Sequence, residues 1–211
     1  MKGPAGAFAL VSLQVLAGTF FFLTIALVRY PFLNRGYFRS TAWVMWPLTL
    51  AVGLEAPDAF RATTITAAAL MASFLAAVYT QRPLLEWLSS AAASCVGVVL
   101  VYRAGGAGTG GLQALSGLIL MGAVTHAMVL GHWYLNQARL PINPLMEQTA
   151  ALGASLALSL TTGVALRGDL VDARVPGAIL AVSGSAYWWT WLLMVAGTAI
   201  LAAMVWATVR V

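Results

Sequence analysis

The chain has two histidines, His126 and His132, and both lie in the stretch THAMVLGHWYLNQARLPINPLMEQ at residues 125–148. An imidazole can ligate a metal, bind a haem iron, or donate a hydrogen bond to a carbonyl oxygen of a ligand. In a helix, a six-residue spacing places two side chains about 120° apart, with about 9 Å of rise between them. The two histidines therefore cannot both ligate one metal or one haem, and each needs a partner from another element.

His126 is the deeper of the two histidines. It lies about fourteen residues into the apolar segment 112–135, which puts it near the middle of a membrane helix of that length. An ionisable side chain at that depth indicates a functional site. His126 is therefore our candidate metal ligand or haem axial ligand, or else a deep polar contact for a quinone. The structural alternative is a neutral imidazole bonded to a backbone carbonyl or a threonine of a neighbouring helix.

Polar and aromatic side chains gather where this segment ends and the next begins. The candidate ligand-binding residues there are His132, Trp133, Asn136, Arg139 and Glu147. All belong to one predicted helix–loop–helix, so we expect them on one side of the membrane, together with Gln148. This mixture suits the head of an amphiphile, either a quinone whose carbonyl accepts from His or Arg, or a phospholipid bound by Arg. The alternative is that these side chains snorkel and cap at an ordinary interface.

A second polar loop, at residues 29–40, can extend this cluster. If it faces the same way, it adds Tyr30, Arg35, Tyr37 and Arg39. Together with Arg29, this loop carries three arginines, which favours a cytoplasmic location for it.

The elements that position these residues are predicted to be membrane helices. The chain has 211 residues, of which 61% are hydrophobic and only 8% charged, and its mean hydropathy is +0.88. A soluble domain is about a quarter charged. The composition therefore predicts an all-α, polytopic transmembrane helical bundle in a membrane, with the cell inner membrane expected. The eleven basic residues form no stripe, so nucleic-acid binding is not predicted.

About 20 apolar residues are needed to cross a bilayer core. Six segments are clear candidates, at residues 7–28, 62–80, 84–102, 112–135, 145–165 and 188–209. Two shorter ones lie at 41–55, which contains Pro47, and at 175–187. We predict eight membrane segments, with seven as the alternative. Segment 7–28 is too long for the core of a signal peptide and is predicted to be a retained first helix.

The chain is predicted to form a single membrane domain, 1–211, with two halves. These halves, 1–104 and 111–211, are joined by the glycine-rich stretch RAGGAGTGG. Each starts with a long helix, a loop and three further segments, which suggests a 4+4 internal repeat. The glycine-rich stretch is neither a P-loop nor a dinucleotide fingerprint, because no strand precedes it and no Lys-Ser/Thr follows it.

Several local patterns carry structural predictions. RPLLEW and NPLMEQ are typical of helix starts, with Pro in the first turn, Glu86 and Glu147 near the positive end of the helix dipole, and Asn143 as an N-cap. The single cysteine, Cys95, lies in an apolar run and is predicted to be buried. YWWTW at 187–191 is predicted to be an aromatic belt at the membrane surface.

The leading functional hypothesis is a non-catalytic subunit of a membrane redox assembly that binds or shields a quinone or haem. Its predicted partners are the lipid bilayer and other membrane subunits. One alternative is a transporter or channel for a small neutral or anionic solute, favoured by the short broken segments in the two halves. Another is a scaffold or assembly factor without a ligand. No hydrolase triad or zinc motif is recognisable, so the sequence does not decide whether the protein is an enzyme.

Overall fold

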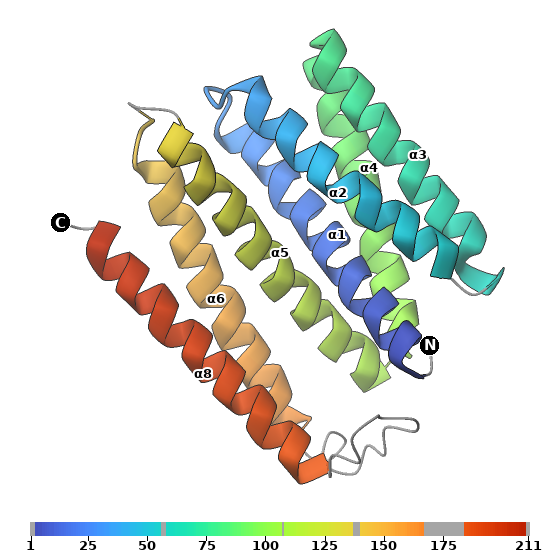
Figure 1. The fold of residues 1–211 in the computed structure, drawn as a ribbon, viewed down its shortest axis with the longest axis vertical. Coiled ribbons are helices and arrows are strands. Elements are labelled where there is room, and N and C mark those ends of the chain that lie inside the picture. The colour runs from blue at the N-terminus through green and yellow to red at the C-terminus, as the bar shows by residue number, and fades with distance from the viewer. Residues whose placement is uncertain (1–2, 56–57, 107, 137–139, 167–183, 210–211) are drawn as a thin grey trace.

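A computed structural model shows a bundle of long helices packed side by side (Figure 1). The structure describes residues 3–55, 58–106, 108–136, 140–166 and 184–209. These residues contain seven helices: α1 (Gly3–Arg29), α2 (Arg35–Glu55), α3 (Asp58–Thr80), α4 (Pro83–Ala104), α5 (Gly108–Asn136), α6 (Asn143–Ala165) and α8 (Gly184–Val209). The predicted all-helical fold is confirmed for this part of the chain.

Three of the helices are long and apolar enough to cross a membrane. The stretches are Ala9–Arg29 in α1, Pro83–Ala104 in α4 and Gly108–Leu135 in α5. Each exceeds the length of about 20 residues that the hydrocarbon core requires. Length and composition therefore support the predicted membrane location, whereas the total of eight or seven spans remains a prediction.

The two short predicted segments have different outcomes. Segment 41–55 belongs to α2, which starts earlier, at Arg35, and continues through Pro47. Hydropathy excluded the first turns of α2 because they carry polar side chains. In the fold, Arg35 and Arg39 of these turns contact Glu86 on α4 and Tyr79 on α3. The last residues of segment 175–187 belong to α8, and the rest of that segment lies outside the described residues.

Helix α1 lies at the centre of the bundle and packs against α2, α4 and α5 (Figure 1). Apolar side chains cover most of its circumference, and Leu13, Phe20 and Leu23 are among those that are fully or almost fully buried. A helix that is apolar on all sides needs neighbours or lipid on all sides. This explains why three helices, α2, α4 and α5, pack against the first helix of the chain.

The contact between α1 and α5 is unusually close because glycines meet at the crossing. A methyl group added at Gly18 would lie 2.7 Å from the Cα atom of Gly122, and an added methyl at Gly122 would in turn meet the backbone of Gly18. Small residues allow two helix backbones to approach to this distance in a membrane. The crossing therefore determines which side chains further along α1 and α5 face one another.

Side-chain hydrogen bonds also join α1 to its neighbours. The Gln14 amide donates to the backbone carbonyl oxygen of Ala114 on α5 at 2.9 Å. The hydroxyl oxygen of Thr24 lies 2.7 Å from that of Ser90 on α4. Such bonds satisfy polar groups that would otherwise be buried without a partner.

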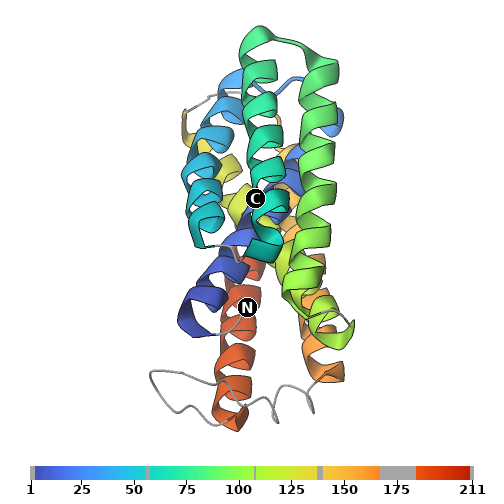
Figure 2. The same cartoon turned by 90° about the vertical axis from the view of Figure 1, so that its right-hand side faces the viewer.

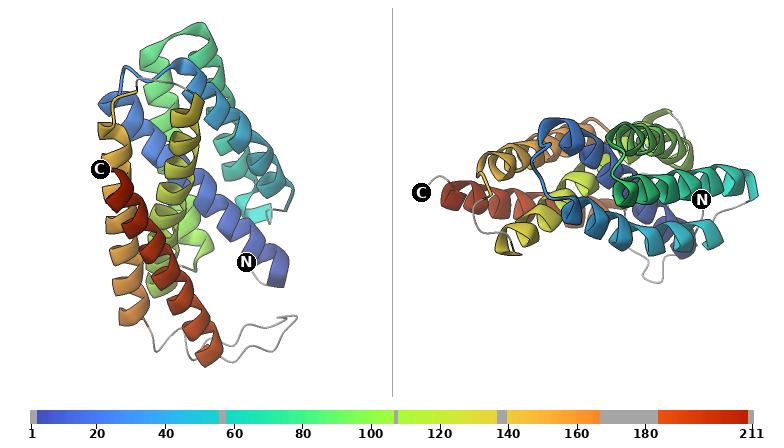
Figure 3. Two further views of the ribbon diagram at one scale, coloured as in Figure 1. Left: turned by 60° about the vertical axis from the view of Figure 1, so that its left-hand side comes forward. Right: turned by 90° about the horizontal axis from the view of Figure 1, so that it is seen from above.

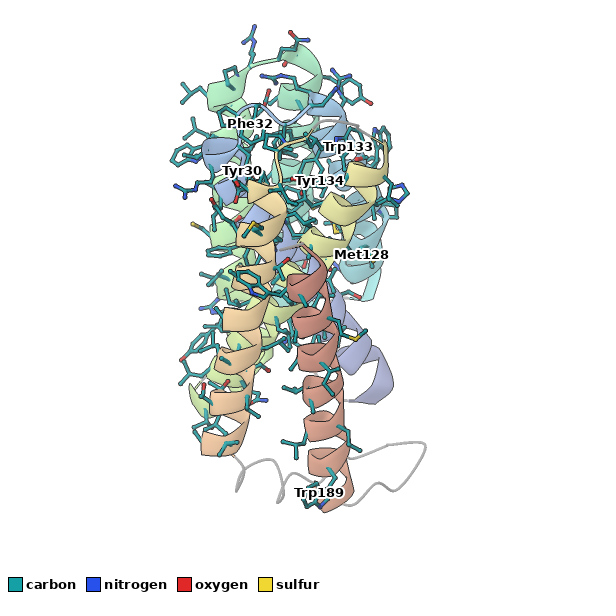
Figure 4. All side chains as sticks on the ribbon, turned by 90° about the vertical axis from the view of Figure 1, so that its left-hand side faces the viewer. Tyr30, Phe32, Met128, Trp133, Tyr134 and Trp189 are labelled. Atoms are coloured by element: carbon teal, nitrogen blue, oxygen red, sulfur yellow. The ribbon has the colours of Figure 1, made fainter. Side chains whose placement is uncertain are left out.

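Ends of helices α1 to α6 meet at one end of the molecule, which we call the polar end. It contains the α1–α2 turn, the α3–α4 turn and the start of α6 (Figure 1). Tyr30, Phe32, Trp133 and Tyr134 gather there, whereas Trp189 of the predicted aromatic belt lies exposed at the opposite end (Figure 4).

The two predicted halves are packed differently. In the first half, α4 returns to pack against α1, whereas α8 contacts α6 alone among the described helices. Seen along the bundle, α8 therefore lies at one edge of the molecule (Figure 3). The 4+4 repeat remains a prediction.

Three local predictions need correction. Cys95 is exposed because it lies on a face of α4 that the described helices leave uncovered. Asn143 is not an N-cap: Ile142 holds that position with helical backbone angles, and no side chain caps the helix. Glu147 lies beyond the first turn of α6, where it pairs with α1 instead of the helix dipole.

The glycine crossing can be tested by adding a single methyl group. We expect Gly122→Ala to lower the free energy of unfolding by about 1–3 kcal/mol, because the backbones of α1 and α5 must separate. Gly131→Ala on the same helix is the control, since an added methyl group there has no neighbour within 4 Å. Unfolding in detergent micelles measures both variants, and equal stability of the two would contradict the close contact.

Candidate functional site

A buried ion pair lies at the polar end. The guanidinium group of Arg35, in the first turn of α2, donates from Nη1 to the carboxylate of Glu86, in the first turn of α4. The Glu86 side chain is only 3% exposed, and that of Arg35 is 34% exposed. A buried carboxylate is strongly disfavoured unless it is paired, so this contact fixes the start of α2 against the start of α4.

A second, more exposed group joins α1 to α6. Arg29 donates from Nε to Glu147 at 3.1 Å, and the Tyr30 hydroxyl donates to the same carboxylate oxygen at 2.7 Å. Burial, and then the hydrogen bond to Glu147, raise the pKa of the Tyr30 phenol above its usual value. The phenol therefore stays protonated and remains a donor throughout the neutral pH range.

A third group joins α2 to α3. The guanidinium carbon of Arg39 lies 4.5 Å from the ring centroid of Tyr79, a distance at which a cation is attracted to the ring face. The indole nitrogen of Trp43 donates to the Tyr79 hydroxyl at 3.1 Å. The polar end is thus held by contacts from different pairs of helices.

His126 lies beneath these groups and is 1% exposed. Its ring centroid is 6.0 Å from that of Phe22 on α1 and 5.8 Å from that of Tyr37 on α2, with the Tyr37 ring edge-on. Gln148 approaches from α6, and its amide donates to the carbonyl oxygen of Ala123. His126 therefore sits where α1, α2, α5 and α6 meet.

Polar atoms around His126 are left without hydrogen bonds. Among the described residues, neither ring nitrogen of His126 makes a hydrogen bond of normal geometry, although the Gln148 side chain lies near the ring. The hydroxyl of Tyr37, which is 0% exposed, makes none either. The predicted bond to a carbonyl or threonine is therefore not made in this structure. Unsatisfied buried polar atoms are uncommon and call for an explanation.

The residues around His126 do not fit a haem. Axial ligation would place an iron and a flat macrocycle against a ring nitrogen, but the rings of Phe22 and Tyr37 pack against the imidazole. Within the described part of the chain, no three metal-ligating side chains lie together. The haem and metal versions of the hypothesis therefore find no support at His126.

The predicted cluster of His132, Trp133, Asn136, Arg139 and Glu147 is only partly brought together. His132 is exposed on α5, whereas His126 is buried. Trp133 packs against Tyr37, with ring centroids 6.2 Å apart, and lies over Gly36. Glu147 faces Arg29 and Tyr30. Arg139 and the side chain of Asn136 fall outside the described residues.

A cavity of about 180 Å³ lies beside the Arg35–Glu86 pair, between α1, α2 and α4. Its apolar walls include Leu27, Leu33, Phe38 and Trp87. Sequence reasoning placed Arg35 near a ligand but missed Glu86, whose position in a helix-start pattern already gave it a local explanation. The signal that was available is that the loop with Arg35 and the helix start with Glu86 were predicted at the same membrane surface.

Comparison with known proteins gives no match to the chain among protein families, curated proteins or solved structures.

The buried ion pair predicts a large effect of removing one partner. Arg35→Met should lower the free energy of unfolding by about 3 kcal/mol, because the Glu86 carboxylate is left buried and unpaired. Adding Glu86→Leu to Arg35→Met should restore most of the loss.

Arg29→Met is the control and should change stability little, because its pair with Glu147 is exposed to solvent. Denaturant unfolding in micelles checks this, and additive single and double effects would contradict the pairing.

The lack of hydrogen bonds at His126 allows a prediction about the stability of a variant at this position. His126→Leu should leave the free energy of unfolding unchanged or raise it, because an apolar side chain of similar size removes two unsatisfied nitrogens. Phe22→Ala is the comparison, since it removes a large buried ring from the same contact and should be clearly destabilising. A clear loss of stability in His126→Leu would mean that the imidazole has a bound partner.

Proposed function

We propose that the protein is an integral, multi-pass membrane protein and a non-catalytic subunit of a membrane redox assembly, which binds a quinone at its polar end. The observation that carries the proposal is the cavity beside Arg35 and Glu86. It combines a fixed cationic donor with apolar and aromatic walls, and the α1, α2 and α4 helix ends that form it lie where a membrane surface is expected.

The side chains around the cavity suit a quinone ring. Arg35 uses Nη1 for Glu86, and a guanidinium group has further N–H donors that can reach a carbonyl oxygen. Phe38 and Trp87 supply flat apolar surfaces for the ring. A cavity of about 150 Å³ is enough to take a benzene ring, so about 180 Å³ leaves room for a substituted one.

The outer wall of the cavity suits the tail of the same ligand. Val28 and Trp87 line it and are 67% and 41% exposed. In a membrane these exposed apolar side chains face lipid, where a long isoprenoid tail would lie. The site therefore differs from the predicted one: it is built by α1, α2 and α4 instead of the helix–loop–helix that carries His132 and Arg139.

Large apolar surfaces support the role of a subunit. Leu193, Ile200 and Met204 are each more than 60% exposed on α8, which contacts α6 alone among the described helices. Such surfaces are available both to lipid and to other membrane subunits. The inner membrane remains the expected location.

The transporter alternative receives less support. The cavity enclosed by α1 to α4 has a volume of only about 30 Å³, and its lining is almost wholly apolar. That space can hold no more than a few water molecules, which leaves little room for a solute path between α1 and α4.

Extraction of the purified protein tests the proposal. Mass spectrometry of the organic extract should find a quinone in near-stoichiometric amount, and Trp87→Ala should reduce it severalfold by removing one wall of the cavity. Trp189→Ala, which removes an exposed tryptophan at the opposite end (Figure 4), should leave the amount unchanged. Absence of quinone from both the protein and its native assembly would refute the proposal.

A further inference from the structure

We infer that the groove between α3 and α4 at the polar end binds an anionic phospholipid, with Arg82 holding the phosphate and one acyl chain lying along the groove. The groove has a volume of about 420 Å³ and is lined by residues of α3, of α4 and of the turn between them. Figure 2 shows α3 and α4 as neighbouring helices joined by this turn. This site is separate from the cavity beside Glu86, and the inference does not depend on quinone binding.

Charge is the first argument for an anionic head. Arg82 lies in the turn between the two helices, lines the groove and is exposed. It makes no ion pair within the described part of the chain. The two described glutamates at this end are already paired, Glu86 with Arg35 and Glu147 with Arg29. The cation at the mouth of the groove is thus left to bind an anion from outside.

A second positive charge lies close to the same hairpin. Arg39 stacks on Tyr79, which precedes the groove residue Thr80 on α3. Cations near a membrane surface attract anionic lipids with an energy of about 1 kcal/mol each. Arg39 does not line the groove, but its charge at this end of the hairpin adds to that of Arg82, which favours a head of net negative charge over a zwitterionic one.

The walls of the groove are the argument for an acyl chain. Thr80 and Ser73 turn their hydroxyls back to carbonyl oxygens of their own helix, at 2.8 and 2.9 Å. The surface that remains consists mainly of Ala76, Leu85 and Leu88. Alanine provides depth and the leucines provide apolar sides, so below Arg82 the groove suits hydrocarbon. The cationic end of the groove complements an anionic head, and its apolar walls complement an acyl chain, so the groove as a whole is complementary to an anionic phospholipid.

Native mass spectrometry of the full-length protein in micelles tests this inference. Phosphatidylglycerol and phosphatidylcholine with identical acyl chains are the probes. The wild-type protein should retain more phosphatidylglycerol than phosphatidylcholine. Arg82→Gln should lower retention of phosphatidylglycerol about fivefold, equivalent to about 1 kcal/mol, and lower that of phosphatidylcholine less, because the choline ammonium already offsets the charge of its phosphate. Arg103→Gln, at the other end of α4, is the matched control and should have no effect.

A second variant tests the channel independently of the charge. Ala76→Leu fills the groove from an exposed position, so it should reduce retention of both lipids while circular dichroism remains unchanged. Equal retention of phosphatidylglycerol by wild-type and Arg82→Gln proteins would overturn the inference. So would complete competition by inorganic phosphate at equal concentration, which would indicate a site for the free ion, or unchanged lipid retention in Ala76→Leu.

Discussion

The close approach of α1 and α5 at Gly18 and Gly122 is the constraint on which the rest of the structure depends. With the two backbones in contact, side chains further along the helices must share the space between them. Phe22 and His126 therefore meet, and α2 adds the edge of Tyr37 to the same contact. A longer side chain at the crossing would separate α1 from α5 and open the region where His126 is buried.

The polar end follows a different physical rule. In an apolar surrounding, a charge is tolerated only with a partner, and here the partners come from different helices. Arg35 reaches from α2 to α4, and Arg29 reaches from α1 to α6. The few charged residues of the chain thus act as connections between helix ends, and two openings lie beside them: the cavity at Glu86 and the groove at Arg82.

Much of the fold could be predicted from composition and segment length. The long apolar runs predicted helices α1, α4 and α5, because an apolar run of that length in a chain with so few charges is expected to form a membrane helix. The burial of His126 followed from its depth in segment 112–135. The first turns of α2 were missed, since Arg35 and Arg39 look like loop residues until Glu86 and Tyr79 are placed beside them.

The candidate site was harder to predict than the fold. Glu147 was grouped with His132 and Arg139 because they are close in the sequence, but its carboxylate faces Arg29 and Tyr30. Likewise, Cys95 was predicted to be buried from its apolar run alone, but it is exposed, because in a bundle that can face lipid an apolar position need not be covered by another helix. Partner choice between helices depends on rotation about each helix axis, which single-sequence patterns do not specify.

The hydrogen bonds of α1 have a consequence for biogenesis. Its polar groups find their partners in residues that are synthesised much later: Thr24 with a residue 66 positions on, Gln14 with one 100 positions on, and Arg29 with one 118 positions on. When α1 leaves the ribosome, the Gln14 amide and the Arg29 guanidinium lack these partners, whereas the Thr24 hydroxyl can already donate to the carbonyl oxygen of Phe20 within α1. The bonds that hold α1 to its neighbours therefore form only after α4, α5 and α6 have been synthesised.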